Sequence, residues 1–149
     1  MSLVDPQTDT KNYLKFTFCR NPFDRMVSNY SMFTKTDFRI KQIQQFHSNP
    51  GKLSFPEFVK LTCQYTNHHW LPQYDFIHGY EIDYIGRFEN LQEDFKIMCD
   101  KAGIPREKLP HHNKSKHKHY TEYYDDETRA IVAEKYAKDI EYFGYKFGE

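Results

Sequence analysis

One short segment of this chain carries side chains that could hold a phosphate. It runs from Phe16 to Tyr30 and contains the pattern Arg-x-Pro-x-x-Arg-x-x-Ser-x-Tyr. A guanidinium can bind a phosphate through two parallel hydrogen bonds, and a serine hydroxyl adds a neutral donor. Arg20 and Ser28 are therefore candidate phosphate ligands. On spacing alone, a surface arginine at a sheet edge and a solvated serine are an equal alternative.

The elements around this segment can be predicted from periodicity. Apolar residues alternate with polar ones over residues 13–19, which predicts a strand that ends before Arg20. Pro22 suits the first turn of a following helix, and an apolar stripe on that helix begins at Phe23. At roughly 100° per residue, Ser28 lies about 140° round from Phe23. Ser28 is therefore expected off the core face, where a ligand could reach it.

The rest of the chain reads as further strands and helices. The predicted elements are a helix from the capping box Ser54–Glu57 to about Tyr65, a structured loop over 66–80, a strand over 81–88, a helix from Leu91 to Gly103, and a last helix capped by Asp125 or Asp126 and ending near Gly144. Residues 34–52 are mostly polar and match no pattern that we can interpret. Strands followed by helices predict an α/β fold with a parallel sheet, where ligands bind beyond the carboxyl ends of the strands.

Composition restricts the kind of protein and of ligand. The chain has 149 residues, which suits a single domain over 1–149, and an aromatic content of 17% excludes a disordered chain. The formal net charge is zero, which favours a small anionic ligand over a nucleic acid. The three cysteines have no metal-ligand spacing and are odd in number, so we expect free thiols in a reducing, cytoplasmic compartment. We see no signal peptide and no apolar run long enough for a membrane span.

Four ordered motifs resemble the carbohydrate branch of the PAPS-dependent sulfotransferases, sulfotransferase family 2. The Arg20–Tyr30 pattern resembles the family's 3′-phosphate motif, and His69-Trp70-Leu71-Pro72-Gln73 resembles its His-Trp-x-Pro-Gln segment. Residues 84–95 resemble its Ile-Gly-Arg-Phe-Glu-Asn-Leu stretch, and residues 123–145 its C-terminal pattern. The similarity runs from about residue 13 to residue 147. It implies a P-loop-NTPase-like sulfotransferase fold, a parallel sheet flanked by helices; animal relatives work in the Golgi lumen.

The resemblance also implies roles for particular residues. Arg20 and Ser28 would hold the 3′-phosphate of PAPS, or of the product PAP. Phe88 would stack near the adenine, although a plain core phenylalanine is an equal alternative. The basic loop 111–119 aligns with a segment that closes over the donor, which makes its residues Lys114, Ser115 and Lys116 candidate phosphate contacts. A solvated mobile loop is an equal alternative.

The implied reaction moves a sulfuryl group from PAPS to a hydroxyl of a carbohydrate acceptor. A base must take the hydroxyl proton, and we predict His69, with His68 as the second choice. A structural histidine ring packed beside Trp70 is an equal alternative. A zinc site is disfavoured because a second ligand cluster is lacking; the histidines that it would use are His111, His112, His117 and His119.

One family part is not found in the sequence: the loop that binds the 5′-phosphosulfate. Only twelve residues precede Tyr13, and Lys11 stands in no such context. The chain is therefore predicted to be truncated at its N-terminus, to borrow the loop from another chain, or to be a non-catalytic relative that binds nucleotide or carbohydrate. A sheet without its first strand would expose an edge, which predicts a homodimer or larger assembly. A P-loop kinase is disfavoured because no Walker-type loop occurs.

Overall fold

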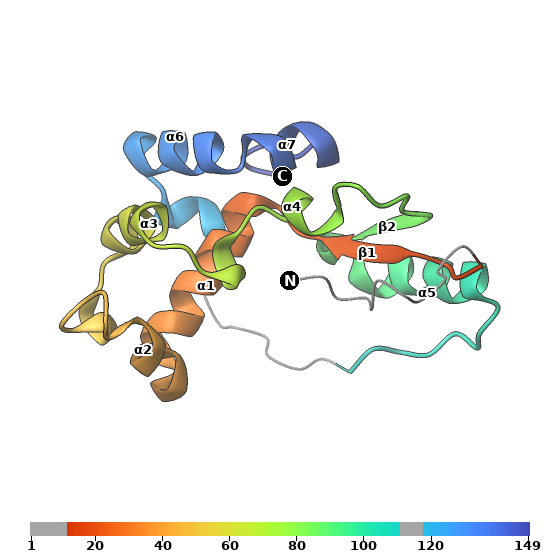
Figure 1. The fold of residues 1–149 in the computed structure, drawn as a ribbon, viewed down its shortest axis with the longest axis horizontal. Coiled ribbons are helices and arrows are strands. Elements are labelled where there is room, and N and C mark those ends of the chain that lie inside the picture. The colour runs from red at the N-terminus through yellow and green to blue at the C-terminus, as the bar shows by residue number, and fades with distance from the viewer. Residues whose placement is uncertain (1–11, 111–117) are drawn as a thin grey trace. The chain divides into compact units, whose positions relative to one another are not determined.

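The computed structural model describes residues 12–110 and 118–149 (Figure 1). Their contacts cluster into two compact units. The first contains residues 12–18 together with Gly79–Leu109, and the second contains Cys19–His78 together with the described part of Pro110–Glu149. Each unit is described separately below. The expectation of a single domain stays a prediction.

The first unit is built around a small parallel sheet of two strands. Strand β1 is Phe16–Cys19, whose last residue belongs to the second unit, and β2 is Tyr84–Arg87. The short 3-10 helix η3 (Phe88–Asn90) leads into α5 (Leu91–Ala102), which packs against β2. A side chain at Gly86 would overlap the Phe18 ring, so glycine lets the two strands pair with that ring between them.

The second unit is helical. Its elements are α1 (Pro22–Lys35), α2 (Asp37–Ile43), η1 (Pro50–Lys52), α3 (Phe55–Gln64), η2 (His68–Trp70), α4 (Tyr74–Ile77), η4 (Tyr120–Tyr123), α6 (Asp126–Lys135) and α7 (Ala137–Phe143). Helix α1 contacts α2, α3, η2, η4 and α6, so it is the centre of this unit (Figure 1). The core residues that it contributes are Phe23, Met26, Val27 and Phe33.

Several local predictions are confirmed. Helix α1 begins at Pro22, as predicted. The structure adds Asn21 as its N-cap, whose side chain accepts from the Phe23 backbone N–H at 3.0 Å. The Ser54–Glu57 capping box is present at the start of α3. Helix α5 ends at Gly103, whose φ of 67° is the left-handed conformation that glycine favours. These features depend on neighbours in sequence, which is why the sequence predicts them.

Other element predictions were wrong. The predicted last helix is divided into α6 and α7 at Tyr136 (Figure 1), and helix α2 lies in the polar stretch 34–52, for which no element was predicted. Tyr136 has non-helical dihedral angles of −111° and 27°, its ring is buried, and its hydroxyl donates to the Trp70 carbonyl at 2.8 Å. This tertiary contact holds the Tyr136 side chain in the core, and the backbone at Tyr136 leaves the helical conformation, so that the helix is not continuous. Both predicted strands are shorter than expected, and Phe16 is 46% exposed.

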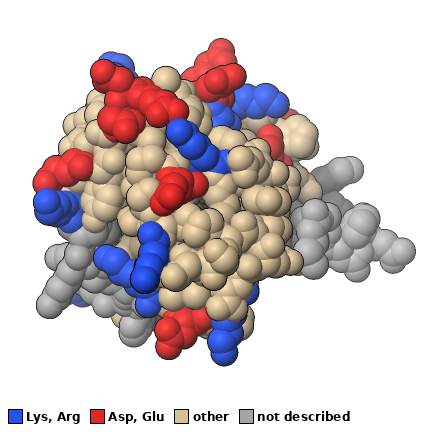
Figure 2. All heavy atoms as spheres, turned by 90° about the vertical axis from the view of Figure 1, so that its left-hand side faces the viewer, with Lys and Arg blue, Asp and Glu red and all other residues tan. Residues whose placement is uncertain are grey.

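The fold class that emerges is mixed α/β with a small parallel sheet and surrounding helices. Acidic and basic side chains are interspersed over the face drawn in Figure 2, which gives this face no continuous positive track for a polyanion. In the part of the chain that the structure describes, no helix combines the length and apolar character needed to cross a membrane.

Candidate functional site

Arg20 stands between the last residue of β1 and the first turn of α1. Its Nε donates to the Asp24 carboxylate at 2.7 Å, and both side chains are about one-fifth exposed. Ser28 lies on α1, half-buried and off the apolar stripe as predicted. Arg20, Asp24 and Ser28 are spaced by four residues each, so they follow one face of the chain as it enters and continues along the helix.

Gln73, the last residue of the His-Trp-Leu-Pro-Gln motif, ties that motif to Arg20. Its side-chain amide accepts from the Arg20 backbone N–H at 2.9 Å and donates to the Arg20 carbonyl at 2.8 Å. The pair of bonds continues the hydrogen-bonding pattern of a strand just past the end of β1. The backbone of the candidate phosphate ligand is therefore held by a side chain from 53 residues away.

A buried carboxylate positions Gln73 in turn. Asp139 of α7 is fully buried, and it accepts from the backbone N–H groups of Gln73 and Tyr74 at 2.9 and 2.8 Å. The Gln73 amide also donates to it at 3.3 Å. Asp139 thus caps the start of α4 and links the C-terminal motif to the His-Trp-Leu-Pro-Gln motif. Its negative charge also raises the pKa of Arg25 against the larger lowering by burial.

Two side chains of α1 fix the backbone of the same motif. Arg25 donates to the Leu71 and His69 carbonyls at 2.8 and 2.9 Å, and Asn29 donates to the His69 carbonyl at 2.9 Å. They lie four residues apart on one helix face, which lets both reach one carbonyl. Trp70 is buried, and its indole N–H donates to the Tyr65 carbonyl at 2.7 Å. The backbone of His69 is therefore held by hydrogen bonds from α1, and the buried side chain of the next residue, Trp70, anchors the same segment.

The His69 ring is hydrogen-bonded to an arginine. Its Nε2 lies 2.8 Å from Nη1 of Arg39, which belongs to α2. A guanidinium only donates, so Nε2 accepts and the His69 ring is neutral with its proton on Nδ1. Burial, Arg39, His68 and Arg25 together lower the pKa of His69 from 6.5 to about 4. His68 is exposed, and its ring centroid lies 4.1 Å from that of His69.

The other predicted residues fall elsewhere. Phe88 opens η3 in the first unit and is 45% exposed, so the alternative of a plain core phenylalanine is wrong. Lys114, Ser115 and Lys116 lie outside the described residues. Residues 12–110 and 118–149 contain no group of three or more histidine, cysteine or acidic side chains that could hold a metal ion.

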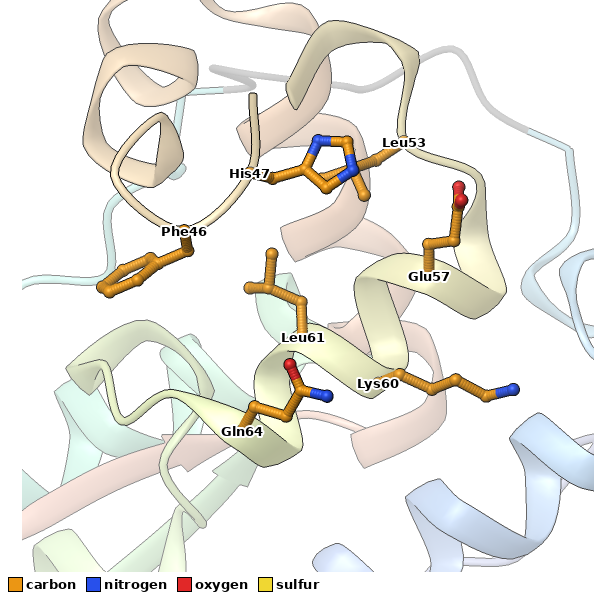
Figure 3. Close-up of a pocket in the computed structure, with 7 residues that line it drawn as sticks. All are labelled: Phe46, His47, Leu53, Glu57, Lys60, Leu61 and Gln64. Carbon is orange, nitrogen blue, oxygen red and sulfur yellow. The ribbon is translucent and has the colours of Figure 1, made fainter. Parts of the chain in front are cut away.

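A pocket of about 250 Å³ lies elsewhere in the second unit, between α3 and the chain that leads into it (Figure 3). Phe46, Leu53 and Leu61 form its apolar part. Its charged residues are already engaged, since Glu57 accepts from Ser54 and Lys60 pairs with Glu127 at 2.8 Å. Of the predicted phosphate ligands and bases that the structure describes, none lines this pocket.

The supporting residues Arg25, Arg39 and Asp139 were missed as site residues by sequence reasoning. Arg25 stood inside the phosphate motif, and its spacing of four from Asn29 was a usable signal. Asp139 stood inside the C-terminal pattern, but its partner lies 66 residues away. Arg39 lay in a stretch without a recognisable pattern.

Comparison with known proteins agrees with the four motifs. The model of the sulfotransferase family matches residues 2–146. The chain belongs to the sulfotransferase family. This confirms the family predicted from the sequence. No solved structure matches the chain.

The relatives include carbohydrate sulfotransferases of animals. Carbohydrate sulfotransferase 11 of Mus musculus is 30% identical over 123 residues, which cover 63% of this chain and 34% of the mouse protein. Carbohydrate sulfotransferase 10 of Xenopus laevis is 25% identical over 180 residues, with coverages of 97% and 51%. An uncharacterized protein of Archaeoglobus fulgidus is 38% identical over 98 residues, with coverages of 64% and 72%. The chain thus spans a third to a half of these two carbohydrate sulfotransferases.

Proposed function

We propose that this sulfotransferase-family chain takes part in moving a sulfuryl group from PAPS to a hydroxyl of a carbohydrate. The observation that carries the proposal is the mutual anchoring of the family motifs. Gln73 of the His-Trp-Leu-Pro-Gln motif holds the backbone of Arg20, and Asp139 of the C-terminal pattern holds Gln73. Residues that share no local structural need are thereby assembled around Arg20, as a preorganised binding site requires.

The donor's 3′-phosphate is assigned to Arg20 and Ser28. The ion pair with Asp24 fixes the Arg20 guanidinium through its Nε edge. A guanidinium has five donors, so that ion pair is compatible with phosphate contacts through its other nitrogens. Ser28 follows two helical turns further along the same face and adds a neutral donor. Phe88 is proposed to stack on the adenine, and Lys114, Ser115 and Lys116 to contact the donor's phosphates.

The acceptor's proton is assigned to His69, with His68 beside it as the second candidate. In the transfer, the acceptor oxygen forms a bond to sulfur while the bond between sulfur and the phosphate oxygen of PAP breaks. The hydroxyl proton passes to the Nε2 lone pair of the neutral histidine, and PAP leaves. A pKa of about 4 keeps His69 neutral at pH 7, which a base requires.

One observation favours the alternative of a non-catalytic binder of nucleotide or carbohydrate. The Nε2 lone pair of His69 is engaged by Arg39 in this structure. A base whose lone pair stays engaged cannot accept a proton. The alternative therefore predicts donor or sugar binding without transfer.

Calorimetric titration with PAP tests the donor site. We expect Arg20→Ala to weaken PAP binding by roughly 10- to 100-fold, which corresponds to the ~1.5–3 kcal/mol of a hydrogen bond to a charged group. The fold should survive, because Gln73 holds Arg20 through its backbone. Arg106→Ala is the matched control, since Arg106 is also paired with an aspartate, Asp100, at 2.6 Å. Equal PAP affinity of wild type and Arg20→Ala would show the assignment to be wrong.

A transfer assay with PAPS and a panel of sugars then distinguishes the enzyme from the binder. Sulfated product supports the enzyme. PAP binding by the wild type with no product from any sugar supports the non-catalytic alternative.

A further inference from the structure

Arg39 is a cation that has no acidic partner among the described residues. It lies half-buried on α2, and its Nη1 donates to Gln42 Oε1 at 2.9 Å and to His69 Nε2 at 2.8 Å. Both partners are neutral. Among residues 12–110 and 118–149, no carboxylate lies within ion-pair distance of it. A half-buried charge normally has a counter-ion, because removing a charge from water is costly.

Two aromatic rings frame the Arg39 guanidinium. Its central carbon lies 5.7 Å from the centroid of Phe33 and 5.6 Å from that of Phe38. Phe33 is fully buried, whereas Phe38 is 66% exposed. The guanidinium therefore lies between the core and the solvent, where a ligand can reach it. An exposed aromatic ring beside a cation is also a suitable surface for the face of a sugar ring.

A second guanidinium, that of Arg25, lies near the same histidine as Arg39. Arg25 donates to the His69 backbone carbonyl, Arg39 contacts the His69 ring, and the His68 ring lies tilted against that of His69. These groups come from α1, α2 and η2, the elements that surround the His69 ring. Such a set attracts an anion, and the planar guanidinium is suited to an oxyanion with two oxygens.

We propose that Arg39 binds an oxyanion carried by the acceptor sugar, and that this binding draws the guanidinium away from His69 Nε2. The oxyanion is the carboxylate of a uronic acid or a sulfate ester already on the sugar. The inference rests on the proposed function, because it assigns the ligand to the acceptor. Its consequence is a coupling between recognition and catalysis. The His69 lone pair becomes available only when a charged acceptor is in place.

Binding of the oxyanion should raise the pKa of His69. Arg39 lowers the pKa of His69, together with burial, His68 and Arg25. An oxyanion on Arg39 cancels part of that positive charge, so the pKa of His69 rises from about 4 toward 6.5. Protons are then taken up on binding between these two values. By linkage, the oxyanion binds more tightly as the pH falls through this range.

Nuclear magnetic resonance of the His69 ring tests the proposal with three probes: glucuronate, glucose 6-sulfate and neutral glucose. We expect the charged sugars, and not glucose, to raise the pKa of His69 in the wild-type chain. The charged sugar that acts at the lower concentration identifies the source of the oxyanion. In Arg39→Gln without ligand, the pKa of His69 should be higher than in the wild type, and the affinity for the charged sugars should fall at least tenfold. Lys41→Gln, an exposed site on the same helix, should behave as wild type.

Equal affinity of wild type and Arg39→Gln for both charged sugars would overturn the proposal, as would equal affinity of the wild type for glucose. If Arg39→Gln does not fold, Arg39→Lys replaces it: the charge is kept and the planar fork is lost, so weaker binding of both charged sugars is again expected. Wild-type affinity of either variant for PAP separates failure of this acceptor site from failure of the donor site.

Discussion

At the scale of single residues, Asp139 connects the C-terminal pattern to the candidate donor site. One buried carboxylate holds the backbone of Gln73 and Tyr74, and through Gln73 it orients Arg20. It also provides the negative charge that partly offsets the burial of Arg25. A change at Asp139 should therefore reach the candidate donor site without touching a ligand.

We predict that Asp139→Asn lowers the free energy of unfolding by roughly 2–3 kcal/mol, because an amide nitrogen would then face a backbone donor and leave it unpaired. Urea unfolding measures this change. PAP affinity should fall as well, since Arg20 loses its support. Glu141→Gln is the control, because Glu141 is an exposed carboxylate on the same helix. A loss no larger than that of Glu141→Gln would contradict the role given to Asp139.

At the scale of elements, helix ends show where local chemistry is sufficient. The sequence left Asp125 and Asp126 as equal candidates for the cap of the last helix. In the structure Asp125 is the N-cap, and its carboxylate accepts from the Thr128 backbone N–H at 2.7 Å. Asp126 is the first helical residue, where it has only the weaker interaction with the helix dipole.

Asp125→Ala should lower the Tm by about 2–4 °C, the usual effect of losing a cap in a chain of this size. Asp126→Ala should change it much less. The hydrogen bonds from Thr128 lower the pKa of Asp125 below 3.8, so the carboxylate stabilises the fold above that pH and the stabilisation is lost as the pH falls through the lowered value. Thermal scans at pH 7 and near pH 3 should show the difference between the variants shrinking. Equal Tm values for the two variants at pH 7 would show that the assignment of the cap to Asp125 is wrong.

At the scale of the whole molecule, the sheet of the described residues is small. The described residues form a sheet of only two strands, so each strand has one edge that no other described strand covers. Phe16 on β1 is 46% exposed. Short two-stranded sheets are marginal alone and are prone to pair with another chain.

We therefore predict that the chain forms a homodimer or a larger assembly. Light scattering at micromolar concentration should give a mass above the 18.1 kDa of one chain. Dilution should shift the mass toward that of one chain, because association follows mass action. A single species of 18.1 kDa across the concentration range would count against the prediction.

The sequence alone determined the features that act over a few residues. Pro22 starts α1, Ser54 and Glu57 cap α3, and Gly103 ends α5, since each needs only neighbours within about one helical turn. The four motifs also determined the family, because residue patterns in a fixed order can be recognised in the sequence without knowing which contacts they make.

Only the tertiary structure decided what those motifs do to one another. Gln73 meets Arg20 across 53 residues, Asp139 meets Gln73 across 66, and Arg39 meets His69 across 30. Periodicity carries no information about such contacts, because it reports only which face of an element is apolar. The depressed pKa of His69 has the same origin. Burial and Arg39 are its largest causes and Arg25 adds to them, and these come together only when the chain is folded, whereas His68 is the neighbouring residue in sequence.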